Sequence, residues 1–93
     1  MQDLAGKVAV ITGAGSGIGE GIARAAASAG MHVVVADIDM QKAEAVAADI
    51  GEHAMACKVD VSSLASVESL RDAALQRFGA VHLLCNNAGV WIG

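Results

Sequence analysis

The sequence predicts an α/β protein built around a doubly wound parallel β-sheet. Its 93 residues are enough for one domain at most. Short apolar runs alternate with glycine-containing turns and alanine-rich helical stretches, which is typical of parallel strands joined by crossover helices. Because such crossovers are right-handed, few topologies remain, and the strand order 3-2-1-4 is the leading one. We therefore expect one incomplete domain over residues 1–93, truncated after its fourth strand.

The four expected strands are short apolar runs, and the first two are rich in β-branched residues. They lie at residues 8–12, 32–36, 54–59 and 81–85. The first two runs, VAVIT and HVVVA, are almost unbroken, as expected for parallel strands covered on both faces, whereas the third is weaker. A glycine or polar cluster follows each strand. These clusters therefore lie at the carboxyl edge of the sheet, where ligands bind in open α/β folds.

Three helical stretches join these strands. The first covers residues 18–29, Asp39 can cap the second, and Ser62 or Ser63 can cap the third. A glycine follows each helix, as is common at helix C-termini, at Gly30, Gly51 and Gly79. Apolar residues at steps of three and four predict the buried sides, which are Ile18, Ile22, Ala25 and Ala29, then Ala43, Val46, Ala47 and Ile50, then Leu64, Val67, Leu70, Ala74 and Phe78.

The glycine loop after the first strand is the strongest functional signal. Its sequence, TGAGSGIG, follows a strand and opens a helix, which is the context that a phosphate-binding loop requires. We expect Gly13 to make the turn, Gly17 to let the backbone approach a pyrophosphate, and Gly19 to let the helix pack on the sheet. Ser16 can donate its hydroxyl to phosphate. The alternative is a glycine-rich turn that merely links strand to helix, although four alternating glycines lose more entropy than a link needs.

Asp37, at the end of the second strand, favours NAD as the ligand. A carboxylate there can accept both hydroxyls of the adenosine ribose and repels the 2′-phosphate of NADP. Neither Ser16 nor Ile38 is basic, so neither would attract that phosphate. The alternative is a solvated or helix-capping aspartate, but Asp39 is the better candidate for the cap.

Asp60 and Val61 follow the third strand. Asp60 could accept a hydrogen bond from the adenine amino group, while the backbone of Val61 lines the pocket. The alternative is a turn aspartate that precedes a serine-capped helix. The sequence leaves both interpretations open.

Composition excludes several classes of function. The net charge is −4 with no cluster of lysine or arginine, so nucleic acid is not an expected partner. The apolar runs are too short to cross a membrane, and Asp3 and Lys7 interrupt the start, so we expect a cytoplasmic protein. Cys57 and Cys85 are expected as reduced, buried thiols. The three histidines lack ligand spacing, so no metal site is expected. With 55 % hydrophobic residues, so small a chain should bury a face against something else.

These motifs together resemble the short-chain dehydrogenases/reductases. The resemblance rests on Thr12-Gly13-xxx-Gly17-x-Gly19, Asp37, Asp60-Val61 and Asn86-Asn87-Ala88-Gly89, in order and each after its own strand. It implies a Rossmann-type fold and an NAD cofactor. By this resemblance, Gly13, Ser16, Gly17 and Ile18 hold the pyrophosphate side, Asp37 the adenosine ribose, and Asp60 and Val61 the adenine. The resemblance also places the segment Asn87-Ala88-Gly89 beside the ribose next to the nicotinamide, and it implies that Asn86 braces the sheet.

The resemblance also implies what this chain lacks. The family's catalytic serine and Tyr-x-x-x-Lys pair follow the Asn-Asn-Ala-Gly strand, but this chain contains no tyrosine, and its lysines, Lys7, Lys42 and Lys58, all precede that strand. We therefore name no catalytic residue here and expect the isolated chain to be inactive. The complete enzyme would be a homo-oligomer that acts on a small alcohol or carbonyl substrate. The alternative is a nucleotide-binding or regulatory module that a partner chain completes.

Overall fold

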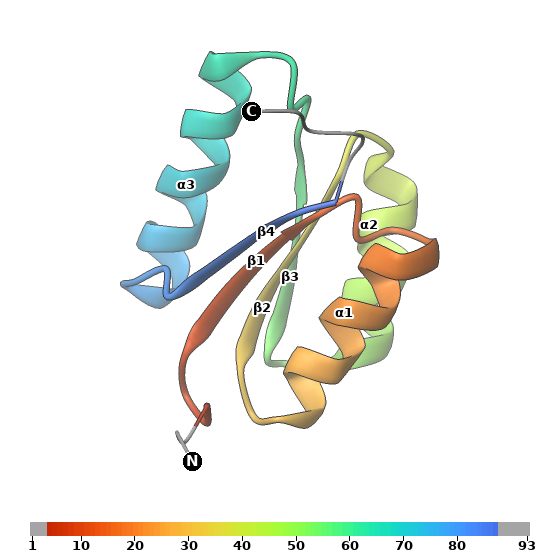
Figure 1. The fold of residues 1–93 in the computed structure, drawn as a ribbon, viewed down its shortest axis with the longest axis vertical. Helices are drawn as coiled ribbons and strands as arrows, with labels where there is room; N and C mark the ends of the chain where they lie inside the picture. The colour runs from red at the N-terminus through yellow and green to blue at the C-terminus, as the bar shows by residue number, and fades with distance from the viewer. Residues whose placement is uncertain (1–3, 88–93) are drawn as a thin grey trace.

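The computed structural model describes residues 4–87, which form a four-stranded parallel sheet flanked by three helices (Figure 1). The strand order is β3-β2-β1-β4, which confirms the predicted topology. In chain order the elements are β1 (Val8–Thr12), α1 (Gly17–Ser28), β2 (His32–Asp37), α2 (Met40–Ile50), β3 (Ala54–Lys58), α3 (Leu64–Phe78) and β4 (Leu83–Asn86).

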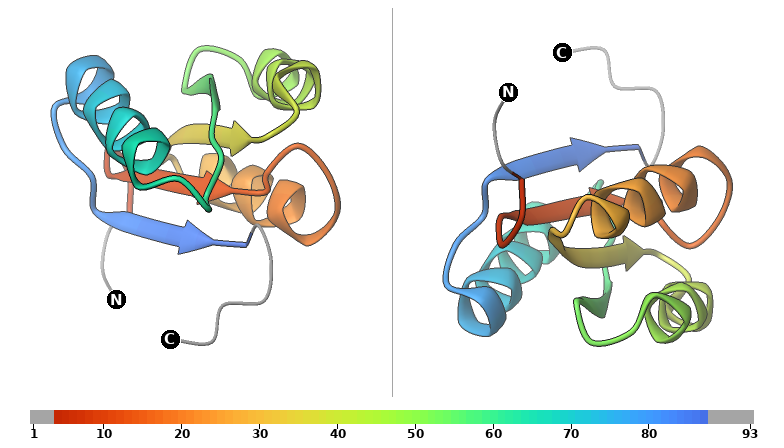
Figure 2. Two further views of the ribbon diagram at one scale, coloured as in Figure 1. Left: turned by 90° about the horizontal axis from the view of Figure 1, so that it is seen from above. Right: turned by 90° about the horizontal axis from the view of Figure 1, so that it is seen from below.

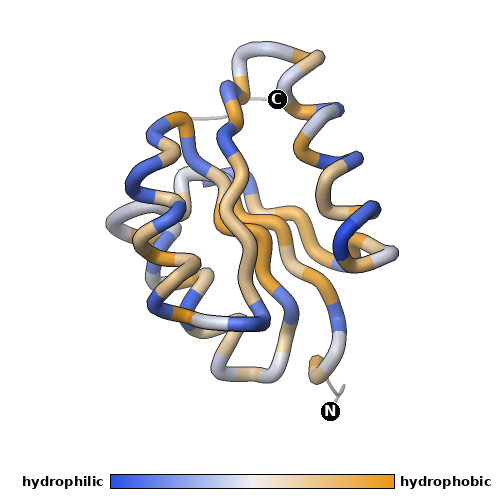
Figure 3. The backbone as a smooth tube through the Cα atoms, turned by 180° about the vertical axis from the view of Figure 1, so that it is seen from behind, coloured by the Kyte–Doolittle hydropathy of each residue, from blue (hydrophilic) through white to orange (hydrophobic). Residues whose placement is uncertain are grey.

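The sheet lies between two helical layers, with α1 and α2 on one face and α3 on the other (Figure 2). Alternate residues of β1 and β2 point to opposite faces, so Ile11 and Val35 pack towards α1 and α2, whereas Val10 and Val34 pack towards Leu70 of α3. All five residues of β1 are buried. Hydrophobic residues accordingly gather along the central strands (Figure 3).

Strand boundaries differ slightly from the prediction. The second strand extends to Asp37, the third stops at Lys58, and the fourth spans Leu83–Asn86 instead of residues 81–85. Register explains the fourth strand, because its ladder with β1 pairs Ala9 with Leu83 and ends at Thr12 with Asn86. The turns that follow the strands, which hold the predicted site residues, therefore begin where the hydrogen-bonded pairing of the strands ends.

The buried side of α1 is the main correction to the predicted fold. Ile18 is 75 % exposed and Ala25 and Ala29 are exposed, whereas Gly19 and Ala23 are buried. Ile22, which the sequence also predicted on the buried side, does pack against the core cluster that contains Ala23. Successive helical residues are rotated by about 100°, so the inward position of Gly19 turns its neighbour Ile18 away from the core. The helix approaches the glycine loop so closely that its inward position requires the smallest residue.

The helix ends follow the predicted capping chemistry. The Asp39 side chain accepts from the amide of Lys42, and the Ser63 side chain accepts from that of Ser66. Gly79 ends α3 in the left-handed conformation, with φ of +81°. The prediction for α2 is confirmed, and of the two serines proposed for α3 the structure selects Ser63.

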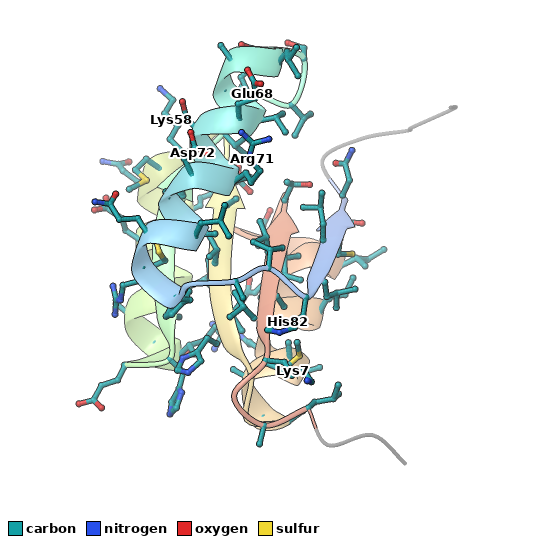
Figure 4. All side chains as sticks on the ribbon, turned by 90° about the vertical axis from the view of Figure 1, so that its left-hand side faces the viewer. Lys7, Lys58, Glu68, Arg71, Asp72 and His82 are labelled. Carbon is teal, nitrogen blue, oxygen red and sulfur yellow. The ribbon has the colours of Figure 1, made fainter. Side chains whose placement is uncertain are left out.

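An apolar groove of about 220 Å³ lies between α3 and the β1–β4 side of the sheet. Leu64 of α3, predicted as buried, is 75 % exposed on it, and Leu84 of β4 is 59 % exposed. Glu68 and Arg71, both on α3, also line the groove and are labelled in Figure 4. Leu64 is exposed because nothing among the described residues covers the first turn of α3 from the β4 side. Two of the exposed large hydrophobic residues, Leu64 and Leu84, thus border this groove.

Within residues 4–87, no helix combines the length and apolar character that crossing a bilayer requires.

Candidate functional site

A cleft of about 470 Å³ opens at the carboxyl edge of the sheet. Turns that follow all four strands contribute to it, because parallel strands present their carboxyl ends on one edge. Its lining residues are Gly13, Ser16, Asp37, Ile38, Val59, Asp60, Val61, Ser62 and Asn87. Predicted residues from the turns after all four strands thus meet at this cleft, whereas Gly17, Ile18 and Gly19 of the predicted set are not among its lining residues. Ile38, Val59 and Ser62 are additional lining residues, and their positions directly beside Asp37 and Asp60 could have indicated them.

The glycine loop requires glycine at three positions for different reasons. Gly13 and Gly17 have φ angles of +63° and +61°, in the left-handed region that side chains disfavour. Gly19 has an ordinary φ, but a Cβ atom there would collide with the carbonyl oxygen of Gly13. The sequence predicts that Gly19 lets the helix pack on the sheet, but its closest contact is the backbone of the glycine loop. A Cβ atom on Gly17 would meet nothing within 4 Å, so the backbone there is open to a ligand.

The N-terminus of α1 lacks a side-chain cap. Ser16 occupies the N-cap position in an extended conformation, but its side chain makes no capping hydrogen bond. Asp39 and Ser63 do cap α2 and α3. The first amides of a helix carry a partial positive charge and need acceptors. Of these helices, α1 is therefore the one that leaves its first amides to an external acceptor, and it borders the cleft.

Asp37 is held in place by two backbone amides. Its Oδ2 accepts from the N–H of Gly15 at 2.9 Å, and its Oδ1 accepts from the N–H of Asp39 at 3.0 Å. Each carboxylate oxygen can accept more than one hydrogen bond, so both retain capacity for a ligand hydroxyl. The half-buried side chain joins the glycine loop to the turn after β2.

Asp60 forms a turn with Ser62. Its Oδ1 accepts from the Ser62 hydroxyl at 2.6 Å and from the Ser62 amide at 3.0 Å. The hydroxyl, and secondarily the amide, lower the pKa of Asp60 below its ordinary value of 3.8. These contacts match the turn interpretation of Asp60. Val61 is 38 % exposed beside it and lines the cleft.

The end of β4 is joined to β1 through Thr12. The buried Thr12 hydroxyl donates to Oδ1 of Asn86 at 2.8 Å and accepts from the Asn87 amide at 2.9 Å. The position of Asn86 agrees with its expected bracing role. Thr12 is part of the glycine motif recognised in the sequence but was assigned no role there, although a hydroxyl residue that ends an aliphatic run was a usable signal. Ala88 and Gly89, also expected at the cofactor, lie outside the described residues.

The histidines lie away from this cleft. His82 is at the amino end of the sheet beside Lys7 (Figure 4), where its Nδ1 accepts from the Val8 amide at 3.0 Å. His32 stacks between His53 and Phe78, with ring centroids 5.0 Å and 4.8 Å apart. Over residues 4–87, no group of three or more His, Cys, Asp or Glu side chains is arranged to hold a metal ion. Cys57 and Cys85, expected as buried, are half-buried, and partial burial raises the pKa of the Cys57 thiol above its ordinary value.

The doubly wound parallel sheet, with its glycine loop at the switch point and a carboxylate at the end of β2, defines a nucleotide-binding α/β protein of the Rossmann class. Residues 7–93 match the short chain dehydrogenase family, and the chain belongs to that family.

Sequence relatives extend well beyond the matched segment. Galactitol 2-dehydrogenase of Agrobacterium fabrum is 46 % identical over 88 residues, which are 95 % of this chain but 34 % of that protein. This chain therefore spans about a third of the length of the curated relatives that it matches.

Solved structures of similar proteins contain nicotinamide cofactors. A 3-ketoacyl-(acyl-carrier-protein) reductase from Brucella melitensis, complexed with NADH, is 51 % identical with a TM-score of 0.85, over 87 % of this chain and 34 % of that one. A short chain dehydrogenase/reductase from Burkholderia phymatum, in complex with NAD, is 46 % identical with a TM-score of 0.86, over 90 % of this chain and 31 % of that one.

Proposed function

We propose that this chain is the NAD-binding part of an oxidoreductase that interconverts an alcohol and a carbonyl compound. One observation carries the proposal: the uncapped N-terminus of α1 and the fixed carboxylate of Asp37 border the same cleft. A dinucleotide presents an anionic pyrophosphate and a ribose diol, and these two features of the cleft complement those groups. The relatives solved with NADH and NAD support the same ligand.

The glycine loop would hold the pyrophosphate. Gly13 and Gly17 turn the backbone with positive φ angles, and nothing lies within 4 Å of the position that a Cβ atom on Gly17 would take. The amides of Gly17 and Ile18 then meet the anion, and the unbonded Ser16 side chain can donate its hydroxyl. Because amide dipoles supply the positive charge, the net charge of −4 is no obstacle to binding.

Asp37 would select NAD over NADP. Its carboxylate accepts from the ribose hydroxyls, and its negative charge repels a 2′-phosphate. Asp60 and Val61 would border the adenine, with Asp60 acting chiefly through its turn with Ser62. Asn87, which Thr12 fixes through its amide, would border the ribose next to the nicotinamide.

The remaining chemistry needs groups that this sequence does not contain. A bound nicotinamide supplies or accepts a hydride, and the substrate oxygen must gain or lose a proton to a nearby acid or base. Tyrosine, which serves in that role in the family that this chain resembles, is absent here. We therefore infer that residues 1–93 bind the cofactor without turnover. In the complete enzyme, we infer that another segment covers the groove beside Leu84 and brings the acid or base to the cleft.

Calorimetric titration with NADH tests the binding site. Gly17→Ala forces a side chain into the left-handed region, which costs about 1–2 kcal/mol locally, and adds a methyl group where the pyrophosphate approaches. The strain is present in both the free and the bound protein, so it lowers stability and leaves affinity unchanged. Because the methyl group obstructs the pyrophosphate, we expect about tenfold weaker NADH binding than in the unaltered protein. Gly21→Ala is the matched control, because its Cβ atom meets nothing within 4 Å. A folded protein that binds no NADH, or equal affinity in both variants, would contradict the proposal.

A further inference from the structure

Gly15 lies between Asp37 and α2, and its backbone conformation does not explain why it is glycine. Its φ is outside the left-handed region, unlike those of Gly13 and Gly17. Its amide donates to Oδ2 of Asp37 at 2.9 Å, and the residue is buried. The requirement for glycine must therefore come from the neighbours of the missing Cβ atom.

Those neighbours leave no room for a side chain. A Cβ atom on Gly15 would lie 2.7 Å from Cβ of Lys42, 2.9 Å from Oδ2 of Asp37 and 3.1 Å from its Cγ. Cβ of Lys42 is fixed to the backbone of α2, so no rotamer change removes it from this position. The carboxylate of Asp37 can rotate about its side-chain bonds. A substitution at Gly15 would therefore displace the carboxylate or push the loop away from α2, and either movement stretches the hydrogen bond between Gly15 and Asp37.

We propose that Gly15 is a positioning residue that sets the preference for NAD over NADP by holding the Asp37 carboxylate at the ribose subsite. The proposal rests on the proposed function and assigns a role to a residue outside the expected binding set. The Gly15 amide stabilises the carboxylate and opposes any rotation that would admit a 2′-phosphate. The absence of a side chain at Gly15 lets this contact form. Cofactor choice thus depends on the pair Gly15 and Asp37, and not on the carboxylate alone.

The test compares the dissociation constants for NADH and NADPH in the full-length protein. Gly15→Ala should lower the NADH preference by roughly tenfold, the scale of one charge-assisted hydrogen bond. Gly21→Ala adds the same methyl group at an exposed position of α1 and should leave the preference within about twofold. In an Asp37→Asn background, Gly15→Ala should no longer change the preference, because no negative charge remains to be positioned.

Two results would overturn the proposal. The first is an unchanged preference for NADH over NADPH in Gly15→Ala. The second is a fall in that preference, caused by Gly15→Ala, that is as large in the Asp37→Asn background as in the unaltered protein. If Gly15→Ala fails to fold by circular dichroism, adding Lys42→Gly removes the closest contact, and the double variant is measured against Lys42→Gly alone. Failure of the proposed function looks different, because the unaltered protein would then bind neither dinucleotide.

Discussion

Replacing Gly19 with alanine places a methyl group where α1 and the glycine loop come closest. The added Cβ atom collides with the carbonyl oxygen of Gly13 and lies 2.7 Å from the Gly13 carbonyl carbon. Both are backbone atoms, so the loop itself must shift. Forced insertion of a methylene-sized group into a packed site costs about 1–3 kcal/mol. The higher helix propensity of alanine offsets up to about 1 kcal/mol of this loss in stability, since alanine is preferred to glycine in a helix.

The assay is thermal unfolding followed by circular dichroism, with Gly21→Ala as the matched variant. Gly21 lies in the same helix, and its Cβ atom would meet nothing within 4 Å, so only the gain in propensity applies there. A domain of this size changes its Tm by roughly 4–8 °C per kcal/mol. We expect Gly21→Ala to raise the Tm by a few degrees and Gly19→Ala to lower it. Equal or higher stability in Gly19→Ala would refute the close approach of α1 to Gly13.

Three further predictions concern side chains at the carboxyl edge of the sheet. Asp37→Ala should narrow the preference for NADH over NADPH, measured as the ratio of their dissociation constants; an unchanged ratio would count against its role at the ribose. Thr12→Val removes the acceptor of the Asn87 amide and the donor to Asn86. Thr12→Val should lower the free energy of unfolding, measured with urea, by about 1–3 kcal/mol, whereas Thr12→Ser, which keeps the hydroxyl, should lose much less. Equal losses in the two variants would argue against a stabilising role of the Thr12 hydroxyl. Ser62→Ala removes the main cause of the lowered Asp60 pKa, so an NMR titration should find this pKa closer to 3.8. Because the pKa of Asp60 is depressed in the folded state, its ionised carboxylate stabilises the fold above about pH 4, and this stabilisation is lost as the pH falls through the folded-state pKa. Ser62→Ala should therefore make the free energy of unfolding less sensitive to acid. An Asp60 pKa that does not change in Ser62→Ala would contradict the assigned cause.

The topology could be predicted because local sequence and tertiary environment agree in this sheet. β1 and β2 are buried on both faces, so their sequences are nearly continuous aliphatic runs that need no knowledge of their partners. The caps at Asp39 and Ser63 are equally local, since each side chain bonds an amide three residues along the chain. Such features depend on short stretches of sequence and are readable from it.

Other features depend on contacts that short stretches of sequence do not encode. Hydrophobic periodicity places the largest apolar residue inwards, so it selected Ile18, whereas the close contact with Gly13 selects Gly19. Gly15 gave no signal of its own, because its need for glycine arises from Lys42 and Asp37. Thr12 meets Asn87 only once β1 and β4 pair. Sequence reasoning thus found the cleft but not the contacts that fix its shape.

A crystal structure of the full-length protein with NAD tests the central claim most directly. The account predicts that pyrophosphate oxygens accept hydrogen bonds from the amides at the start of α1, and that the adenosine ribose hydroxyls donate to Asp37. A nucleotide bound away from the glycine loop, or an Asp37 carboxylate that does not contact the bound nucleotide, would contradict it.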